Sequence, residues 1–100
     1  MPAVYRLEKS KLKSKKWTII TPSGKKINFG AKGYSDYTIH KDSDRKERYI
    51  SRHKSQENWK KSGINTAGFW ARWLLWNQPT LEGSIRSTSK KFNIRISKKR

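Results

Sequence analysis

Residues 67–76 read AGFWARWLLW, the most distinctive stretch of the sequence. Arg72 is its only charged residue, so in a helix the apolar side chains would point almost all the way round. A helix without a polar face is normally buried, and we predict a central helix against which the rest of the chain packs. Two alternatives are an aromatic platform that stacks nucleobases and an interfacial membrane anchor. The missing polar face favours the core over both.

The segments on either side of that helix predict further strands and helices. Two runs rich in β-branched and aromatic residues flank the turn residues 22–24 and predict a β-hairpin over residues 16–29. Asp44 and Glu47 form a capping-box-like pair in a predicted helix that begins near residues 42–44. Over about 44–55, Tyr49, Ile50 and His53 are expected to face inward. A short strand is expected over 3–7 and an ordered loop over 34–40. Thr66 is expected to cap the Trp-rich helix, and Thr80 a third helix with Leu81, Ile85, Thr88 and Phe92 on one face. A strand over 92–96 can join the hairpin.

These elements predict an α+β fold. We expect a small single domain with an antiparallel β-hairpin, a closing C-terminal strand, two to three short helices and the buried Trp-rich helix. The compact domain is predicted to span residues 15–97. Residues 1–14 are expected to form a basic N-terminal arm or a short strand, and residues 98–100 a basic tail.

The composition narrows the class of function. The 100 residues include 25 Lys and Arg against seven Asp and Glu, a formal net charge of +18, which predicts an anionic partner. Twelve aromatic residues argue against a disordered basic chain. No cysteine is present, which excludes disulfides, thiol catalysis and zinc sites with thiolate ligands. We find neither a membrane-spanning apolar run nor a signal peptide, so we expect a cytoplasmic or nuclear protein that is not secreted and has no membrane partner.

The basic residues predict where an anionic partner binds. Bases alternate with aromatic residues over 34–59, a pattern that suits phosphates and stacked rings. Three arginines recur there at helical spacing and would line one helix face, while lysine clusters near both termini would supply electrostatic capture. The alternatives are a solvated helix face paired with neighbouring acids, and tails that serve solubility or nuclear import. The predicted nucleic-acid-binding residues are Lys9, Lys11, Lys13, Lys15, Lys16, Lys41, Arg45, Arg48, Arg52, Lys98, Lys99 and Arg100.

Catalytic chemistry finds little support in the sequence. His40 and His53, with nearby carboxylates such as Asp36, Asp42, Asp44 and Glu47, are the only candidates for a metal or general-base site. The two histidines are thirteen positions apart, which matches no standard ligand spacing. A packed histidine with a satisfied hydrogen bond is the better interpretation of each. We therefore predict no catalytic residue, no metal and no cofactor.

Several short words follow one another in a characteristic order. They are FGAKGYSDYTIHK at 29–41, RKERY at 45–49, RH at 52–53, ENW at 57–59, TAGFW at 66–70, RWLLWN at 72–77 and PT at 79–80. This order resembles a family of short basic proteins of giant and other large nucleocytoplasmic DNA viruses, relatives of mimivirus and marseillevirus. The resemblance covers about residues 15–85. It implies a viral protein, packaged in the virion or present in the host nucleus or cytoplasm, that acts around the viral genome, and it supplies no catalytic residues.

The sequence as a whole predicts a small basic nucleic-acid-binding protein. Double-stranded DNA, contacted through phosphates with low sequence specificity, is the first expectation and RNA the second, because no base-reading motif is recognisable. The alternative is an adaptor that docks on an acidic protein surface, such as a histone or a virion protein. A nuclease is a distant third.

Overall fold

The computed structural model of the protein describes residues 3–98, and a four-stranded sheet forms one layer of it. Strands β2 (Lys15–Ile20) and β3 (Lys26–Ala31) make the predicted hairpin. Strand β1 (Val4–Lys9) pairs antiparallel with β2, and β4 (Arg95–Lys98) pairs parallel with β1. The sheet order is therefore β3-β2-β1-β4.

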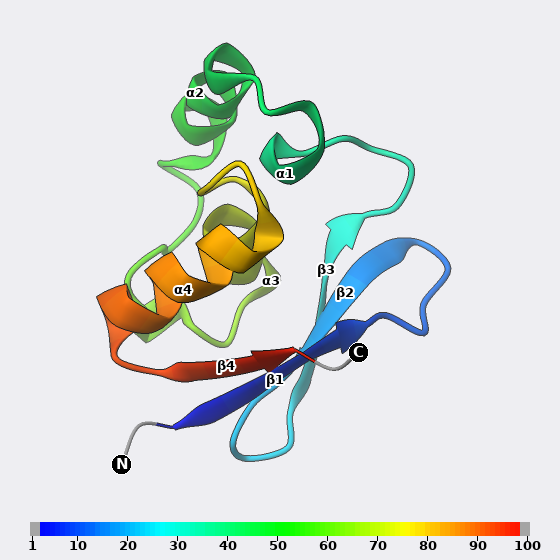
Figure 1. The fold of residues 1–100 in the computed structure, drawn as a ribbon, viewed down its shortest axis with the longest axis vertical. Coiled ribbons are helices and arrows are strands. Elements are labelled where there is room, and N and C mark those ends of the chain that lie inside the picture. Colours follow the sequence, from blue (N-terminus) through cyan, green and yellow to red (C-terminus); the bar gives the residue numbers. More distant parts are fainter. Residues whose placement is uncertain (1–2, 99–100) are drawn as a thin grey trace.

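The helices form the second layer (Figure 1). α3 (Ala67–Trp70), the π-helical turn η2 (Ala71–Leu75) and α4 (Leu81–Phe92) pack on one face of the sheet, while α1 (Tyr37–His40) and α2 (Ser43–His53) lie beyond the end of β3. A 3-10 turn, η1 (Lys61–Gly63), precedes α3. The α+β class is confirmed. Within residues 3–98, none of these helices is long and apolar enough to cross a membrane.

The core lies between the sheet and the Trp-rich segment, as predicted. Trp70 has no exposed surface, and its indole Nε1 donates a hydrogen bond to the Ile64 carbonyl oxygen at 2.7 Å. The alternation of β1 and the hairpin supplies the facing side chains. The buried hydrophobic residues of this cluster are Tyr5, Leu7, Ile19, Ile27, Phe29, Phe69, Trp70, Leu74, Leu75, Phe92, Ile94 and Ile96. Trp73 and Trp76, by contrast, are only partly buried.

Basic residues near both ends of the described chain belong to strands of the sheet and not to tails. Residues 4–9 adopt the strand alternative, and β1 lies inside the sheet with Leu7 opposite Ile19 on one side and Lys98 on the other. The closing strand joins β1 and not the hairpin. It also begins at Arg95 and includes Lys98, whereas residues 92–96 were predicted. Lys98, which was expected in the basic tail, therefore belongs to β4, and Lys99 and Arg100 lie outside the described residues.

Helix ends explain the remaining boundary differences. Asn93 adopts the left-handed conformation with φ 52°, so α4 continues through Phe92 before the chain turns into β4. α2 begins after Asp42, whose carboxylate accepts from the Asp44 and Arg45 amides at 3.0 and 3.3 Å. The predicted cap Asp44 instead sits in the first turn, where its charge favours the helix dipole. The predicted caps Thr66 and Thr80 are confirmed.

Candidate nucleic-acid interface

Helix α2 is anchored by one buried side chain and carries a row of exposed arginines beside it. Tyr49 is its only buried residue, and its ring stacks face to face on Trp76, with centroids 4.3 Å apart and planes 3° apart. Burial raises the pKa of the Tyr49 phenol above its ordinary 10, so the phenol is uncharged at neutral pH. Arg45, Arg48 and Arg52 are all exposed, and Arg45 and Arg52 line the same pocket as Tyr49. The predicted arginine row therefore stands on a helix whose rotation is fixed by the Tyr49 ring.

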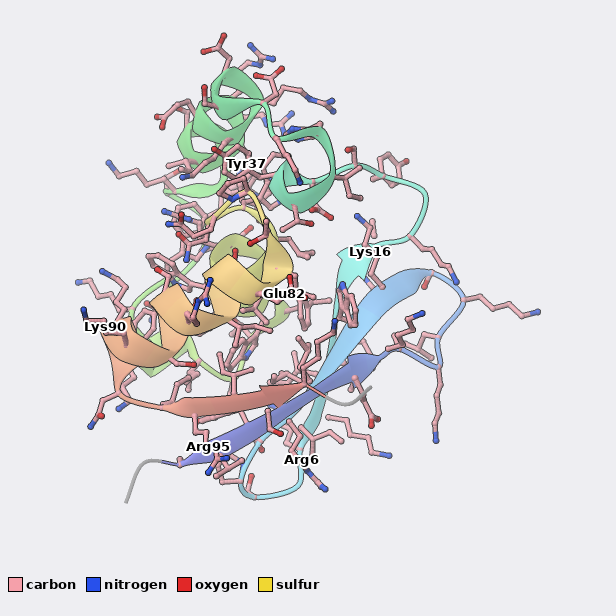
Figure 2. The ribbon with its side chains drawn as sticks, in the orientation of Figure 1. Arg6, Lys16, Tyr37, Glu82, Lys90 and Arg95 are labelled. Atoms are coloured by element: carbon pink, nitrogen blue, oxygen red, sulfur yellow. The ribbon has the colours of Figure 1, made fainter. Side chains whose placement is uncertain are left out.

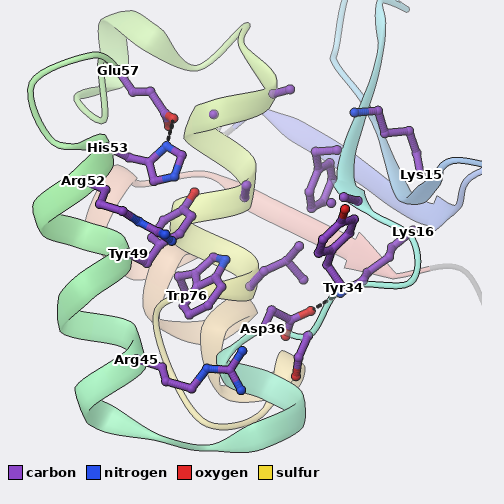
Figure 3. Close-up of a pocket in the computed structure, with 18 residues that line it drawn as sticks. Lys15, Lys16, Tyr34, Asp36, Arg45, Tyr49, Arg52, His53, Glu57 and Trp76 are labelled. Atoms are coloured by element: carbon purple, nitrogen blue, oxygen red, sulfur yellow. Dashed lines mark hydrogen bonds and ion pairs between the residues drawn. The ribbon is translucent and has the colours of Figure 1, made fainter.

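An open pocket of about 470 Å³ lies where α2 approaches β2 and β3 (Figure 3). Arg45 and Arg52 border it from the α2 side, and Lys15 borders it from β2. The rings of Tyr49 and Trp76 lie between these bases. Cations around an aromatic surface can hold a phosphate-bearing ligand, because charge and ring surface are both presented.

Lys16 has a structural role at the edge of this pocket. Its ammonium contacts the Asp36 carboxylate at 2.6 Å, and both side chains are largely buried. Asp36 also caps α1 by accepting from the Thr38 amide at 2.9 Å. This lysine was predicted as a phosphate contact. The structure ties it to the fold through Asp36 instead.

Two other predicted contacts also hold parts of the fold together. Lys41 donates to the carbonyl oxygens of Thr38 at 2.9 Å and Pro79 at 2.8 Å, which links α1 to the loop before α4. Lys98 lies 3.8 Å from a Glu82 carboxylate oxygen, and its ammonium is 5.8 Å from the centroid of the Trp17 ring. Their amines are thus partly engaged within the protein.

The remaining lysines of the N-terminal cluster lie on an ordered loop and not on a flexible arm. Lys9 ends β1, and exposed Lys11 and Lys13 lie in the β1–β2 connection. The loop is closed by a backbone hydrogen bond from the Ser10 amide to the Lys16 carbonyl at 3.1 Å. Two strands therefore hold these lysines in place.

The two histidines extend the stack of rings beneath α2. The His40 ring lies 5.3 Å from Trp76, and the His53 ring lies 4.4 Å from Tyr49. His40 Nδ1 accepts from the Asp42 amide at 2.9 Å, and His53 Nδ1 is 2.7 Å from a Glu57 carboxylate oxygen. Burial, and secondarily Arg45, lowers the pKa of His40. Across residues 3–98, no group of three or more His, Asp and Glu side chains could hold a metal ion.

Sequence reasoning missed two basic surfaces. Arg6 and Arg95 lie on the sheet face opposite the helices, because the alternation that buries Tyr5 and Ile96 turns their neighbours outward (Figure 2). Arg72, within the Trp-rich segment, stacks against the indole rings of Trp73 at 4.3 Å and Trp59 at 5.3 Å. Arg72 is the only charged residue of this otherwise apolar helix, and it could have indicated that its side of the helix is not fully buried.

Comparison with known families gives one match. Residues 5–53 are similar to a family of unknown function, DUF5754. The matched segment begins in β1 and ends with the last residue of α2, so it contains the arginine row and stops before the Trp-rich segment. Comparisons with curated proteins and with solved structures give no match.

Proposed function

We propose that the protein binds nucleic acid through phosphates and with little sequence preference, and that duplex DNA binds on the α2 surface. The observation that carries this proposal is the row of exposed arginines at positions 45, 48 and 52 on a helix anchored by Tyr49. Side chains projecting from an ordered helix can fix the register of a complex, which a flexible chain cannot do. The net charge of +18 supports an anionic partner for the whole surface.

The spacing of the row suits a phosphate backbone. Residues 45 and 52 are seven positions apart, which is about 10 Å along a helix axis. One DNA strand places its phosphates about 3.4 Å apart along the duplex axis, so the row spans about three base-pair steps. Lys15 across the pocket can contact the same backbone from the sheet side. The resemblance to proteins of large DNA viruses supports a viral genome or the host nucleus as the setting.

The test is a salt titration of binding to short duplexes of two unrelated sequences. We expect equal affinity for both, and a loss on the order of 10³-fold between 50 and 200 mM salt if about six phosphates are contacted. A variant with Arg45, Arg48 and Arg52 changed to Gln should reduce the slope of log affinity against log salt by up to about 2.7, since each lost contact removes about 0.9.

The matched control removes the same charge from the other end of the molecule. Arg6, Lys25 and Lys26 are exposed there, and changing them to Gln should reduce the slope less than the α2 variant does. Equal losses in the two variants would remove α2 from the interface. Binding to an acidic histone or virion peptide at 100 mM salt, with no retention of DNA, would overturn the proposal in favour of the adaptor.

A further inference from the structure

A second cleft, of about 600 Å³, shares Glu57 with the pocket between α2 and the strands β2 and β3. The segment after α2 forms one wall, and Trp73 of η2 with the C-terminal end of α4 forms the other. Its lining side chains are mainly of two kinds, aromatic residues with indole or phenyl rings and lysines with ammonium groups. These residues are Trp59, Trp73 and Phe92, with Lys54, Lys60, Lys61 and Lys91.

The polar edge of each indole at this cleft is already occupied by a hydrogen bond within the protein. The Trp73 Nε1 donates to the Trp59 carbonyl oxygen at 2.9 Å, and the Trp59 Nε1 donates to a Glu57 carboxylate oxygen at 3.0 Å. Both indole N–H groups are therefore satisfied within the protein. What remains for a ligand is ring surface, and both rings are only partly buried. The contact available is stacking.

Trp73 is held rigidly in this position. The Thr88 hydroxyl donates to its carbonyl oxygen at 3.1 Å, and its ring meets Phe92 edge to face at 5.3 Å. It lies in the π-helical turn, which is closed by the Trp76 amide donating to the Ala71 carbonyl at 3.1 Å. Such turns are frequent at functional sites. The platform is thus formed before any ligand arrives.

The charges around the rings select the ligand. Glu57 is the only acid in the lining, and its carboxylate is engaged by both His53 and the Trp59 indole. Four lysines line the cleft together with the rings. The Lys91 ammonium lies 5.2 Å from the Trp73 ring centroid, and Arg72 stacks on the indoles of Trp59 and Trp73. Aromatic clefts elsewhere hold cationic ligands such as methylated lysine, but this charge repels a cation. A flat uncharged ring joined to negatively charged phosphates fits instead.

We propose that this cleft holds an unpaired nucleobase of a single strand, stacked on Trp59 and Trp73, with the flanking phosphates on the surrounding lysines. This inference rests on the proposed function, because it specifies which form of nucleic acid the protein prefers. Bases within a duplex are already stacked on each other and cannot enter. The protein therefore binds a single strand, or the unpaired end of a duplex, more tightly than a blunt duplex. Stacking on an aromatic side chain corresponds to roughly 5- to 150-fold in affinity.

The experiment compares two probes, an oligothymidylate and a blunt duplex with the same number of phosphates. Binding of the full chain is followed by tryptophan fluorescence and, in parallel, by anisotropy of a labelled probe. We expect the oligothymidylate to bind more tightly and to quench tryptophan emission. Trp59→Leu should lose roughly 5- to 150-fold in affinity for the oligothymidylate and keep the parent's affinity for the blunt duplex. Trp17→Leu is the matched control, because Trp17 is a partly buried indole with a lysine nearby, outside this cleft, and should change neither affinity.

The outcomes separate this inference from the proposed function. A parent protein that binds the blunt duplex as tightly as the oligothymidylate refutes the stacking site and leaves the proposed function standing. A parent that binds neither probe refutes both. If Trp59→Leu fails to fold, the double variant Lys54→Gln and Lys61→Gln serves instead, since both side chains are exposed. Loss of the oligothymidylate preference in that variant supports the cleft, and an unchanged preference overturns it.

Discussion

Leu7→Ala tests whether the basic N-terminal segment is part of the folded domain. Leu7 has no exposed surface, and its strand is paired on both sides, with β2 and with β4. Replacing a fully buried leucine by alanine removes its transfer free energy and leaves a cavity, at a cost of about 2–5 kcal/mol. We expect a value in the upper half of this range, because Leu7 lies between two packed strands that cannot easily close the gap.

That cost is large for a domain of this size. A chain of about 100 residues has a free energy of unfolding of roughly 5–15 kcal/mol. Each kcal/mol shifts the melting temperature by about 4–8 °C, so Leu7→Ala should lower it by about 14–40 °C. The measurement is urea unfolding followed by tryptophan fluorescence, since the core indole of Trp70 reports on the packing that β1 completes.

Leu12→Ala is the matched control from the same basic segment. Leu12 lies in the β1–β2 loop with 50% of its surface exposed, and its replacement should change the free energy of unfolding by less than about 0.5 kcal/mol. A loss below about 1 kcal/mol for Leu7→Ala would refute the reasoning. The segment would then behave as an arm that the sheet does not need.

Two further predictions concern single residues near the pocket. Gly30→Ala should lower the free energy of unfolding by at least about 1–2 kcal/mol, because Gly30 has φ 79° and an added Cβ would lie 2.8 Å from Leu75 Cδ1; an unchanged urea midpoint would contradict this. Burial holds the pKa of His40 below its ordinary 6.5, so the unfolded chain binds a proton that the folded chain does not, and stability should fall as the pH drops from 6.5 through the folded pKa. His40→Asn should make this pH dependence shallower, and equal slopes for parent and variant between about pH 7 and 5 would show that His40 does not contribute.

The elements that have local causes could be predicted from the amino-acid sequence alone. The hairpin of β2 and β3 follows from two β-rich runs around a turn, and the caps Thr66 and Thr80 start their helices because each hydroxyl accepts from an amide three residues on. The burial of Trp70 follows from the lack of a polar face. The spacing of Arg45, Arg48 and Arg52 likewise placed them together on α2.

The pairing of β1 with β4 could not be predicted from the sequence and is seen only in the folded protein. Their partners, such as Tyr5 and Ile96, lie at opposite ends of the sequence, and no turn between them sets a register. Parallel pairing also has no local signature, because the connection contains the rest of the domain. The same holds for Lys16, Lys41 and Lys98, whose charge alone predicts phosphate contact and whose partners come from distant segments.

The candidate sites also combine a part that the sequence predicts with a part that only the fold shows. Periodicity shows which residues share a helix face, but it does not show what that face meets. The stack of Tyr49 on Trp76 joins α2 to the Trp-rich segment. The cleft lined by Trp59 and Trp73 joins the segment after α2 to the same Trp-rich segment. Apolarity alone predicted a mostly buried helix and did not show which of its tryptophans would stay partly exposed. Whether a ring is covered depends on how closely the second segment packs against it, and that distance is set by the whole fold.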